Sequence, residues 1–403
     1  MIAPLDGVRI LDFTRHMSGP YATVFMADYG ADVIKIEGLP DGDASRTTGE
    51  LVQGKVSAPY LMWNRGKRSL AIDMRSPRGI EIIRKLVETA DVLVENYKPG
   101  VADKIGIGYE AMRQINPGLI YVSISAFGRG PLEPFPGTDP VVQAMSGIMS
   151  VTGEEDGGPV LVGVPMADFT AAMIGVQAVT LGLLARAKTG EGQLIEISML
   201  HAMLTSLTTR LATHWATGQE PRRNGGAHSV VMPYQVWRTS DGFVVAGVWN
   251  GGNVMWPRFC EAVEMPELGE RPEFATNSDR LEAHRELSEI LQARFIQHPT
   301  AYWERRFRER QVLFSPVYTF SEILDHPHIQ QAGVIQQLDH PLLGATPQIT
   351  PPAVLHGTPG RLDRHAPLLG EHSREILTEA AFGNDEIDRL LSDSVILQAE
   401  VAR

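Results

Sequence analysis

The stretch VRILDF, residues Val8–Phe13, is a short apolar run with the length of a buried strand. The segment Pro20–Tyr29 follows it and has the features of a helix, with proline at the start and Gly30 just past the end. A second apolar run, DVIKIE, occupies Asp32–Glu37. Strand, helix and strand in this order predict a βαβ unit whose strands are parallel and whose crossover is right-handed.

The same alternation extends outward from this unit along the first half of the chain. Further strand-like apolar runs lie at Leu70–Met74, Asp91–Glu95, Leu119–Ser125 and Gln193–Met199. A long helix rich in small residues spans Ala171–Lys188. The pattern predicts an α/β fold with a parallel sheet and helices on both faces. Ligands of such sheets bind where loops leave the carboxyl ends of the strands, here Thr14–Gly19, Asn96–Ile107 and Ala126–Asp139.

A linker-like segment, Glu220–Gly226, separates this half from a part of different character. Two runs, Tyr234–Thr239 and Phe243–Val248, flank the turn-forming segment Ser240–Gly242 and predict a β-hairpin. Helical periodicity returns beyond the hairpin, so we predict a smaller α+β domain at about residues 225–325.

The helices expected in this smaller domain are Leu281–Ile296 and Ala301–Glu309. The tail beyond it is rich in proline and glycine, which favours an extended course. We expect one last helix, beginning near Ser373.

The composition is that of a folded acidic protein. The chain has 403 residues, with 36 Lys+Arg against 48 Asp+Glu and a formal net charge of −12. This balance argues against a binder of nucleic acids or anionic membranes, whose surface would be basic. Cys260 is the one cysteine, which excludes an intramolecular disulfide and a cysteine-rich zinc site. We see no signal peptide and no run of about 18 apolar residues, so we expect a soluble cytoplasmic enzyme.

Most stock catalytic motifs are absent from the sequence. It contains no GxxxxGK(S/T) phosphate loop, no HExxH metal-binding helix and no GxSxG nucleophile elbow. The loop after the first strand lacks GxGxxG, so a dinucleotide site has no fingerprint. The 12 histidines are scattered, without metal-ligand spacing to acidic residues. We therefore expect no metal site, and a catalytic carboxylate becomes the best candidate for chemistry.

Asp168 lies in the segment VGVPMAD, just before the N-terminal end of the long apolar helix. Two roles are open for it. An aspartate there can cap the helix, because its oxygens accept hydrogen bonds from N–H groups of the first turn. It can instead act as a nucleophile in acyl transfer, forming a mixed anhydride and then a thioester. The two roles are compatible, since the positive end of the helix would keep the carboxylate ionised.

Several sequence blocks follow one another along nearly the whole chain: VRILDFTRHMSGP (8–20), GADVIKIE (30–37), NRGKRSLAID (64–73), VENYKPGVADKIGI (94–107), VGVPMAD (162–168), KTGEGQ (188–193) and LGEHS (369–373). In this order they resemble the class III coenzyme A transferase family of the CaiB/BaiF type. That family includes formyl-CoA and carnitine-type CoA transferases and, as a branch, the α-methylacyl-CoA racemases.

The resemblance implies a fold and an assembly. The fold would be a large Rossmann-like domain made from both chain ends, residues 1–215 and 330–403, with the small domain at 225–325 between them. Two subunits of the family interlock like chain links. The implied partner is therefore a second copy of this chain, in an obligate homodimer.

The resemblance also implies a reaction on Asp168, which matches the aspartate that takes the acyl group in the family's transferases. It would attack the donor thioester and form an aspartyl–acyl anhydride, then an aspartyl–CoA thioester, from which CoA moves to the acceptor acid. Each step conserves an activated acyl bond, so no ATP, metal or permanently bound cofactor is expected, and coenzyme A enters as a substrate. Each step also develops an oxyanion that needs N–H donors.

Further site residues follow from the same resemblance. The residues that match the CoA-binding positions are His16, Met17, Ser18, Arg65, Lys67, Arg68, Asn96, Tyr97, Lys98 and Lys104. The residues that match a glycine-rich loop covering the aspartate are Gly247, Asn250, Gly251 and Gly252. Candidates to hold a second carboxylate of the substrate are Tyr60, Arg46 and Arg129, although each residue type at such a position is more often packing or surface.

Two departures from the family bear on the substrate. Met17 stands where formyl-CoA transferases carry glutamine, and Gly38 stands where they carry arginine. Both changes argue against formate–oxalate exchange. A different pair of acids is expected, and the resemblance to the family favours succinyl-CoA as the donor.

A third departure separates transferase from racemase. The racemase branch places a histidine base in Gly-His-Asp, whereas this chain has Gly137-Thr138-Asp139. Threonine cannot act as an imidazole base near neutral pH. We therefore expect a CoA transferase, and the alternatives are an α-methylacyl-CoA racemase or epimerase and a non-catalytic acyl-CoA-binding protein.

Overall fold

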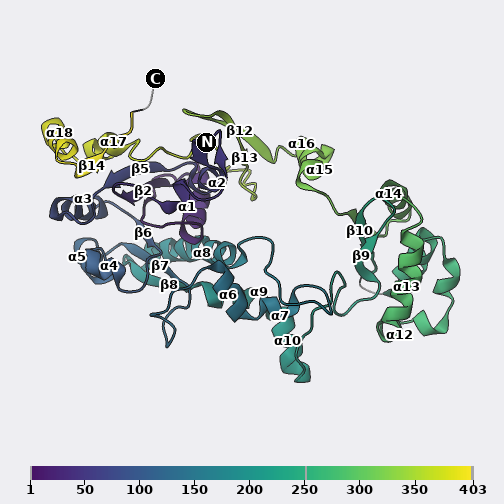
Figure 1. Cartoon of the computed structure of the whole chain (residues 1–403). Helices are drawn as coiled ribbons and strands as arrows, with labels where there is room; N and C mark the ends of the chain where they lie inside the picture. The colour runs from purple at the N-terminus through teal and green to yellow at the C-terminus, as the bar shows by residue number, and fades with distance from the viewer. Residues whose placement is uncertain (1, 250–251, 401–403) are drawn as a thin grey trace. The chain divides into compact units, whose positions relative to one another are not determined.

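The computed structural model describes residues 2–249 and 252–400 of the chain (Figure 1). The chain divides into two compact units. Unit 1 comprises Met1–Ile148, Leu161–Gly218 and Gln331–Arg403. Unit 2 comprises Met149–Val160 and Gln219–Gln330. Unit 1 thus contains both the beginning and the end of the chain.

Within the described residues, unit 1 is built on a seven-stranded sheet in the order β14-β5-β2-β1-β6-β7-β8. The strands are β1 (Arg9–Asp12), β2 (Asp32–Gly38), β5 (Arg68–Ile72), β6 (Val92–Glu95), β7 (Ile120–Ser125), β8 (Gln193–Ser198) and β14 (Ile396–Leu397). All neighbouring strands pair in parallel except β14, which runs antiparallel to β5. The predicted α/β fold with a parallel-dominated sheet is confirmed.

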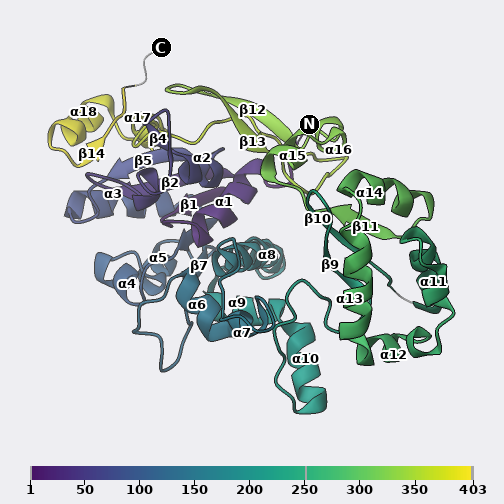
Figure 2. The same ribbon diagram turned by 45° about the vertical axis from the view of Figure 1, so that its right-hand side comes forward.

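Helices cover both faces of this sheet (Figures 1 and 2). One face packs against α1 (Ser18–Asp28), α8 (Met166–Thr189) and α9 (Met199–Ser206), and the other against α3 (Pro77–Val87), α5 (Tyr109–Ile115), α17 (Ser373–Glu379) and α18 (Asn384–Ser392). Successive strand residues point to opposite faces, so Ile10 of β1 joins one core and Leu11 joins the other. Burial on both faces explains why these strands are continuous apolar runs.

Helix α8 lies unusually close to its neighbours. A Cβ atom at Gly175 would lie 3.1 Å from Cβ of Ala22 in α1, and one at Gly182 would lie 3.0 Å from Ile120 in β7. The helix is also long and apolar enough to cross a membrane by length and composition, with a mean hydropathy of 1.5 over an 18-residue window that is 33% buried. The expectation that no such run occurs is therefore wrong, although a core helix passes the same test.

Unit 2 is an α+β structure around a small antiparallel sheet in the order β11-β10-β9. The hairpin of β9 (Tyr234–Arg238) and β10 (Phe243–Gly247) is present as predicted, and β11 (Leu313–Pro316) pairs with β10. The helices around the sheet are α11 (Gly252–Ala262), α12 (Asn277–Glu282), α13 (His284–Phe295) and α14 (Thr300–Glu309). The helix expected at Leu281–Ile296 starts earlier and is divided at Ala283.

The tail contains more structure than the sequence indicated. A second hairpin, made of β12 (Ile335–His340) and β13 (Gly344–Ile349), lies before α17 (Ser373–Glu379). Helix α18 and strand β14 follow α17. Helix α17 begins at Ser373 as expected, but it is not the last helix. Only alternate residues of the hairpin are buried, so its strands lack the continuous apolar run that marks the central strands.

Shorter elements complete the chain. They are β3 (Leu51–Val52), β4 (Val56–Ser57), α2 (Ala58–Asn64), α4 (Val101–Ile105), α6 (Asp139–Ser146), α7 (Ile148–Val151), α10 (Thr208–Thr217), α15 (Phe320–Asp325) and α16 (Pro327–Gln331).

Candidate active site

The sheet of unit 1 has its switch point at β1, which lies between β2 and β6. The chain leaves β1 toward β2 on one side and later continues from β6 on the other side. The loops that follow β1 and β6 therefore diverge from adjacent strand ends. In open α/β sheets, ligands bind in the crevice that forms at such a point.

A cavity of about 570 Å³ opens at this point. All three loops that the sequence singled out contribute to it, and α8 adds Asp168. The lining residues that bear on the chemistry are His16, Ser18, Asn96, Tyr97, Lys98, Thr138, Asp139 and Asp168. The structure thus brings the candidate nucleophile together with five of the residues that match the CoA-binding positions.

Asp168 lies inside the first turn of α8, whose N-cap position is Pro165. Its carboxylate does not cap the helix. Instead, Oδ1 of Asp139 accepts hydrogen bonds from the amides of Ala167, at 2.7 Å, and Asp168, at 3.3 Å. The capping role that was open for Asp168 therefore belongs to Asp139.

The electrostatic setting makes Asp168 more basic than an ordinary aspartate. Burial raises the pKa of Asp168 from 3.8 to about 6, and the negative charge of Asp139 adds to the rise. Hydrogen bonds from the hydroxyl and amide of Ser18 act in the opposite direction. The helix N-terminus does not lower the pKa of this carboxylate, because the amides of Ala167 and Asp168 donate to Asp139 instead. A carboxylate with a pKa of about 6 is still largely ionised at neutral pH and is a stronger nucleophile.

A network of hydrogen bonds fixes the loop that faces Asp168. His16 adopts a left-handed backbone conformation with φ of 60°, and its amide donates to Oδ1 of Asp43 at 3.2 Å. Nζ of Lys35 holds Asp43 at 2.9 Å. The side-chain amide of Asn96 accepts from the backbone N–H of Arg15 and donates to its carbonyl, both at 2.8 Å. The cavity wall on this side is therefore rigidly preorganised.

Five residues that match CoA-binding positions lie outside the lining of this cavity, namely Met17, Lys104 and the three basic residues of the NRGKRSL block. Met17 is buried in the fold, and Lys104 is exposed on α4. The five others that reach the cavity are His16, Ser18, Asn96, Tyr97 and Lys98. Arg15 stacks over the ring of Tyr97, with 5.2 Å between its guanidinium carbon and the ring centre.

The basic residues of the NRGKRSL block point elsewhere. All three are nearly or fully buried in ion pairs. The pairs are Arg65–Asp28 at 2.6 Å, Lys67–Asp12 at 2.8 Å and Arg68–Asp32 at 2.6 Å. The expectation that these three cations bind the phosphates of CoA is therefore corrected, because their charges are already neutralised inside the fold.

The candidates for a second substrate carboxylate are also placed differently. Arg46 pairs with Glu37 at 2.6 Å and stacks on the ring of Tyr60, whose hydroxyl donates to the Pro367 carbonyl. Both side chains hold the C-terminal segment in place, so their expected role toward substrate is corrected. Arg129 is exposed, does not line the Asp168 cavity, and pairs with Glu196 and with Glu133 at the cavity's edge.

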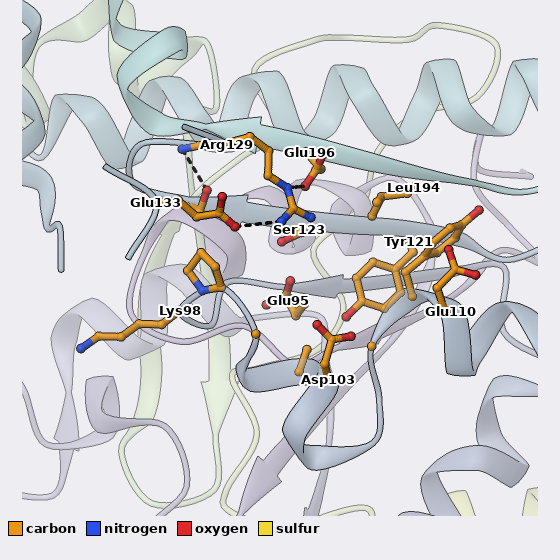
Figure 3. A pocket seen from close by; sticks show the side chains of 17 residues that line it. Glu95, Lys98, Asp103, Glu110, Tyr121, Ser123, Arg129, Glu133, Leu194 and Glu196 are labelled. Carbon is orange, nitrogen blue, oxygen red and sulfur yellow. Dashed lines mark hydrogen bonds and ion pairs between the residues drawn. The ribbon is translucent and has the colours of Figure 1, made fainter. Parts of the chain in front are cut away.

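A second cavity of about 250 Å³ adjoins the first and shares Lys98, Ser125 and Glu133 with it. Figure 3 shows its carboxylates, which are Glu95, Asp103, Glu110, Glu133 and Glu196. Arg129 pairs there with Glu196 and Glu133, whereas Lys98 extends away from the acidic side (Figure 3). The excess of negative charge makes this cavity unsuited to the phosphates of CoA.

The residues that match a glycine-rich loop belong to unit 2. Gly247 ends β10, where a Cβ atom would lie 2.4 Å from Cα of Tyr234, so close strand pairing requires this glycine. Gly252 begins α11. Asn250 and Gly251 lie outside the described residues, so their expected role stays a prediction.

Sequence reasoning missed the part that Asp139 plays. The sequence drew attention to this residue only as the neighbour of Thr138, whereas the structure places its carboxylate beside Asp168, the candidate nucleophile. Asp139 and Asp168 are 29 positions apart, and they meet because α6 and α8 pack together. A local sequence pattern carries no signal for such a contact.

The sequence matches a known protein family over most of its length. The sequence pattern described as CoA-transferase family III matches residues 5–373. The chain belongs to CoA-transferase family III. It is therefore a CoA-transferase, an enzyme whose substrates are CoA thioesters.

Curated relatives cover nearly the whole chain of this family III CoA-transferase. A human succinyl-CoA:glutarate CoA-transferase is 37% identical, covering 99% of this chain and 91% of the relative. A succinate–glutarate CoA-transferase from Agrobacterium fabrum is 35% identical over 93% of this chain and 95% of the relative. A succinyl-CoA:mesaconate CoA-transferase from Haloarcula hispanica is 34% identical over 94% of this chain and 97% of the relative.

Solved structures show the same fold. A CaiB/BaiF family protein from Brucella suis superposes with a TM-score of 0.85 at 34% identity, covering 94% of this CoA-transferase and 100% of that chain. The protein Rv3272 from Mycobacterium tuberculosis gives a TM-score of 0.82 at 26% identity, over 93% of this chain and 99% of that one.

Proposed function

We propose that this CoA-transferase moves CoA from succinyl-CoA to a free dicarboxylic acid, and that Asp168 carries first the acyl group and then CoA. The observation that carries the proposal is the setting of Asp168. Its carboxylate lines the cavity at the switch point, does not cap its helix and has a pKa raised to about 6. The named activities of the relatives from human, Agrobacterium and Haloarcula support succinyl-CoA as the donor and a dicarboxylate as the acceptor.

The reaction needs no external proton or oxidant. The Asp168 carboxylate attacks the thioester carbonyl of succinyl-CoA, the C–S bond breaks, and CoA thiolate leaves an aspartyl–succinyl anhydride. The thiolate then attacks the aspartyl carbonyl, which releases succinate and forms an aspartyl–CoA thioester. The acceptor carboxylate attacks the carbonyl of this thioester, the C–S bond breaks again, and CoA thiolate leaves a second anhydride between Asp168 and the acceptor. The thiolate finally attacks the acceptor acyl carbon, giving the new acyl-CoA and the free Asp168 carboxylate.

Neighbouring residues have complementary roles in this scheme. The hydroxyl and amide of Ser18 donate to the Asp168 carboxylate and are placed to stabilise an oxyanion that develops there. Tyr97 offers an aromatic surface to CoA, and Lys98 and Lys104 offer exposed cations for its phosphates. His16 and Asn96 complete the wall next to the thioester.

We also propose that the protein works as an interlocked homodimer. Large apolar side chains stand exposed on unit 1 of the single chain, among them Val141, Met145, Leu181, Leu184 and Trp215. Exposed apolar side chains in such number indicate a surface that another protein covers. A second copy of the chain is the occupant that the family resemblance implies.

The proposed function is tested by incubating the protein in D₂O with succinyl-CoA and a mixture of glutarate, mesaconate and monocarboxylic acids. Mass spectrometry should show a new acyl-CoA that carries no deuterium at its α-carbon. With succinyl-CoA alone, the protein should gain the mass of CoA less one water, and Asp168→Asn should prevent this gain. Deuterium in unchanged acyl-CoA without a new thioester would instead establish a racemase, despite Thr138. Tight binding of succinyl-CoA without any product would establish a binding protein.

A further inference from the structure

Asp139 and Asp168 form a pair of neighbouring acidic residues at the start of α8. Asp139 is 9% exposed and lines the same cavity as Asp168. Within residues 2–249 and 252–400, neither carboxylate forms an ion pair with a basic side chain. Two like charges in a partly buried site are unfavourable unless another interaction compensates.

The compensating interactions fasten the segment that carries Asp168. Oδ1 of Asp139 accepts from the amides of Ala167 and Asp168, and Oδ2 accepts from Nε2 of Gln143 at 2.7 Å. The other end of Gln143 accepts from the amide of Val162 at 3.0 Å. Asp139 and Gln143 of α6 thus hold both ends of the segment 162–168. The first turn of α8 is fixed by a neighbouring helix rather than by its own residues.

We propose that Asp139 is a positioning residue for the transfer reaction. Asp139 fixes the turn that carries Asp168, and it accepts from helix amides that would otherwise stabilise the Asp168 carboxylate. The proposal rests on the proposed role of Asp168 as the acyl carrier. Asp139 does not touch the reacting carbonyl in this scheme, and it acts only through Asp168.

The charge of Asp139 has a direct consequence for the intermediates. Asp168 is an anion in the free enzyme, but it is uncharged in the anhydride and in the thioester. A negative neighbour therefore destabilises the free carboxylate and leaves the covalent states almost unaffected. The titratable groups that face Asp168 across the cavity are His16, Tyr97, Lys98, Glu133 and Asp139. Of these, Asp139 is the one whose charge acts on the pKa of Asp168.

The substitution Asp139→Asn removes the charge and keeps the oxygen that accepts from the two amides, while its NH2 group replaces the oxygen that accepts from Gln143. We expect the acid limb of kcat/KM to move to lower pH by roughly 0.5–1 unit. We expect kcat at pH 8 to fall by roughly two- to fivefold, because Asp168 becomes a weaker base and nucleophile. The fraction of enzyme trapped as aspartyl–CoA thioester on succinyl-CoA should fall as well. The melting temperature should fall slightly, because the bond to Gln143 is lost.

Two matched variants isolate the effect. Gln143→Met loosens the same segment but keeps the charge of Asp139, so it should lower kcat without moving the acid limb. Asp279→Asn changes a comparable cap in unit 2, where Oδ2 accepts from the amide of Thr276 at 2.9 Å. It should leave both kcat and the pH profile unchanged.

An acid limb that stays in place in Asp139→Asn, with an unchanged thioester fraction, would overturn the proposal and leave Asp139 a purely structural cap. An acid limb that moves in Gln143→Met would overturn it too, and this result is available even if Asp139→Asn fails to fold. These outcomes differ from failure of the proposed function. In that case Asp168→Asn would itself retain transfer and form the same products.

Discussion

Asp12 and Asp168 are carboxylates of the same unit that occupy opposite electrostatic settings. Asp12 ends β1 and is fully buried, with Nζ of Lys67 at 2.8 Å. Burial alone would raise the pKa of Asp12, but the charges of Lys67 and Lys35 outweigh it and lower the pKa to about 2. Asp168 is also largely buried, yet it faces Asp139 instead of a lysine, and its pKa is raised to about 6.

The comparison shows that the charge of the neighbour, rather than burial, separates the pKa of the structural carboxylate Asp12 from that of Asp168, the proposed nucleophile. The charge of Asp12 is neutralised by its lysine, so this carboxylate is a poor base and a poor nucleophile. Among the residues that the structure describes, Asp168 pairs with no such cation, and its carboxylate remains more basic. The same distinction explains the misassigned basic residues. Lys67 resembles a phosphate ligand in sequence, but its counterion is already inside the protein.

Removing the reactive carboxylate should produce the largest effect. Asp168→Asn should lower kcat by on the order of 10³-fold or more, because an amide cannot form the anhydride. The fold should be retained, as judged by circular dichroism. Turnover of succinyl-CoA with glutarate by coupled mass spectrometry measures the loss. A variant that kept more than a tenth of the wild-type rate would show that the reaction does not need the Asp168 carboxylate.

Breaking the structural pair should destabilise the protein instead. Lys67→Met leaves Asp12 buried without its ammonium partner, and we expect a loss on the order of 3–5 kcal/mol in the free energy of unfolding. Urea denaturation measures this loss. The control is Lys98→Met, an exposed lysine whose removal should change stability by less than about 0.5 kcal/mol. Equal stability losses in the two variants would contradict the assignment.

The pH dependence of the reaction sharpens the comparison. The free enzyme must have Asp168 ionised to attack, so kcat/KM should fall about tenfold per pH unit below pH 6. Asp12 has a pKa of about 2 and remains ionised throughout this range. An initial-rate series between pH 4.5 and 8.5 measures the profile. An acid limb near pH 4 would show that Asp168 has the pKa of an ordinary exposed aspartate.

The smallest predicted effect concerns stability at Asp168 itself. The folded-state pKa of about 6 lies above the ordinary value of 3.8, so between these pH values the folded state binds more protons. Wild-type stability should therefore fall as the pH rises from about 4 to 6. Asp168→Asn removes this penalty and should be more stable above pH 6, by at most about 3 kcal/mol. The difference in melting temperature between variant and wild type should vanish near pH 4. A difference that is independent of pH would contradict the argument.

The sequence predicted the parallel sheet, the helices on both faces and the three loops that meet at the cavity. These features follow from local periodicity, because strands buried on both faces leave continuous apolar runs. The hairpin of β12 and β13 was missed, since its half-buried strands give no such run. The roles of Arg65, Lys67 and Arg68 were misjudged, because a basic residue has the same sequence signal whether its counterion is protein or ligand.

Sequence by itself determined the α/β architecture, the family blocks and the choice of Asp168 as the candidate nucleophile. Only the tertiary structure decided that Asp139 caps α8, that Lys67 neutralises Asp12 and that Asp168 pairs with no cation among residues 2–249 and 252–400. The physical reason is distance along the chain. Lys67 and Asp12 are 55 positions apart, and Asp139 and Asp168 are 29 positions apart. The pKa of a buried carboxylate depends on neighbours that only the packing of strands and helices supplies.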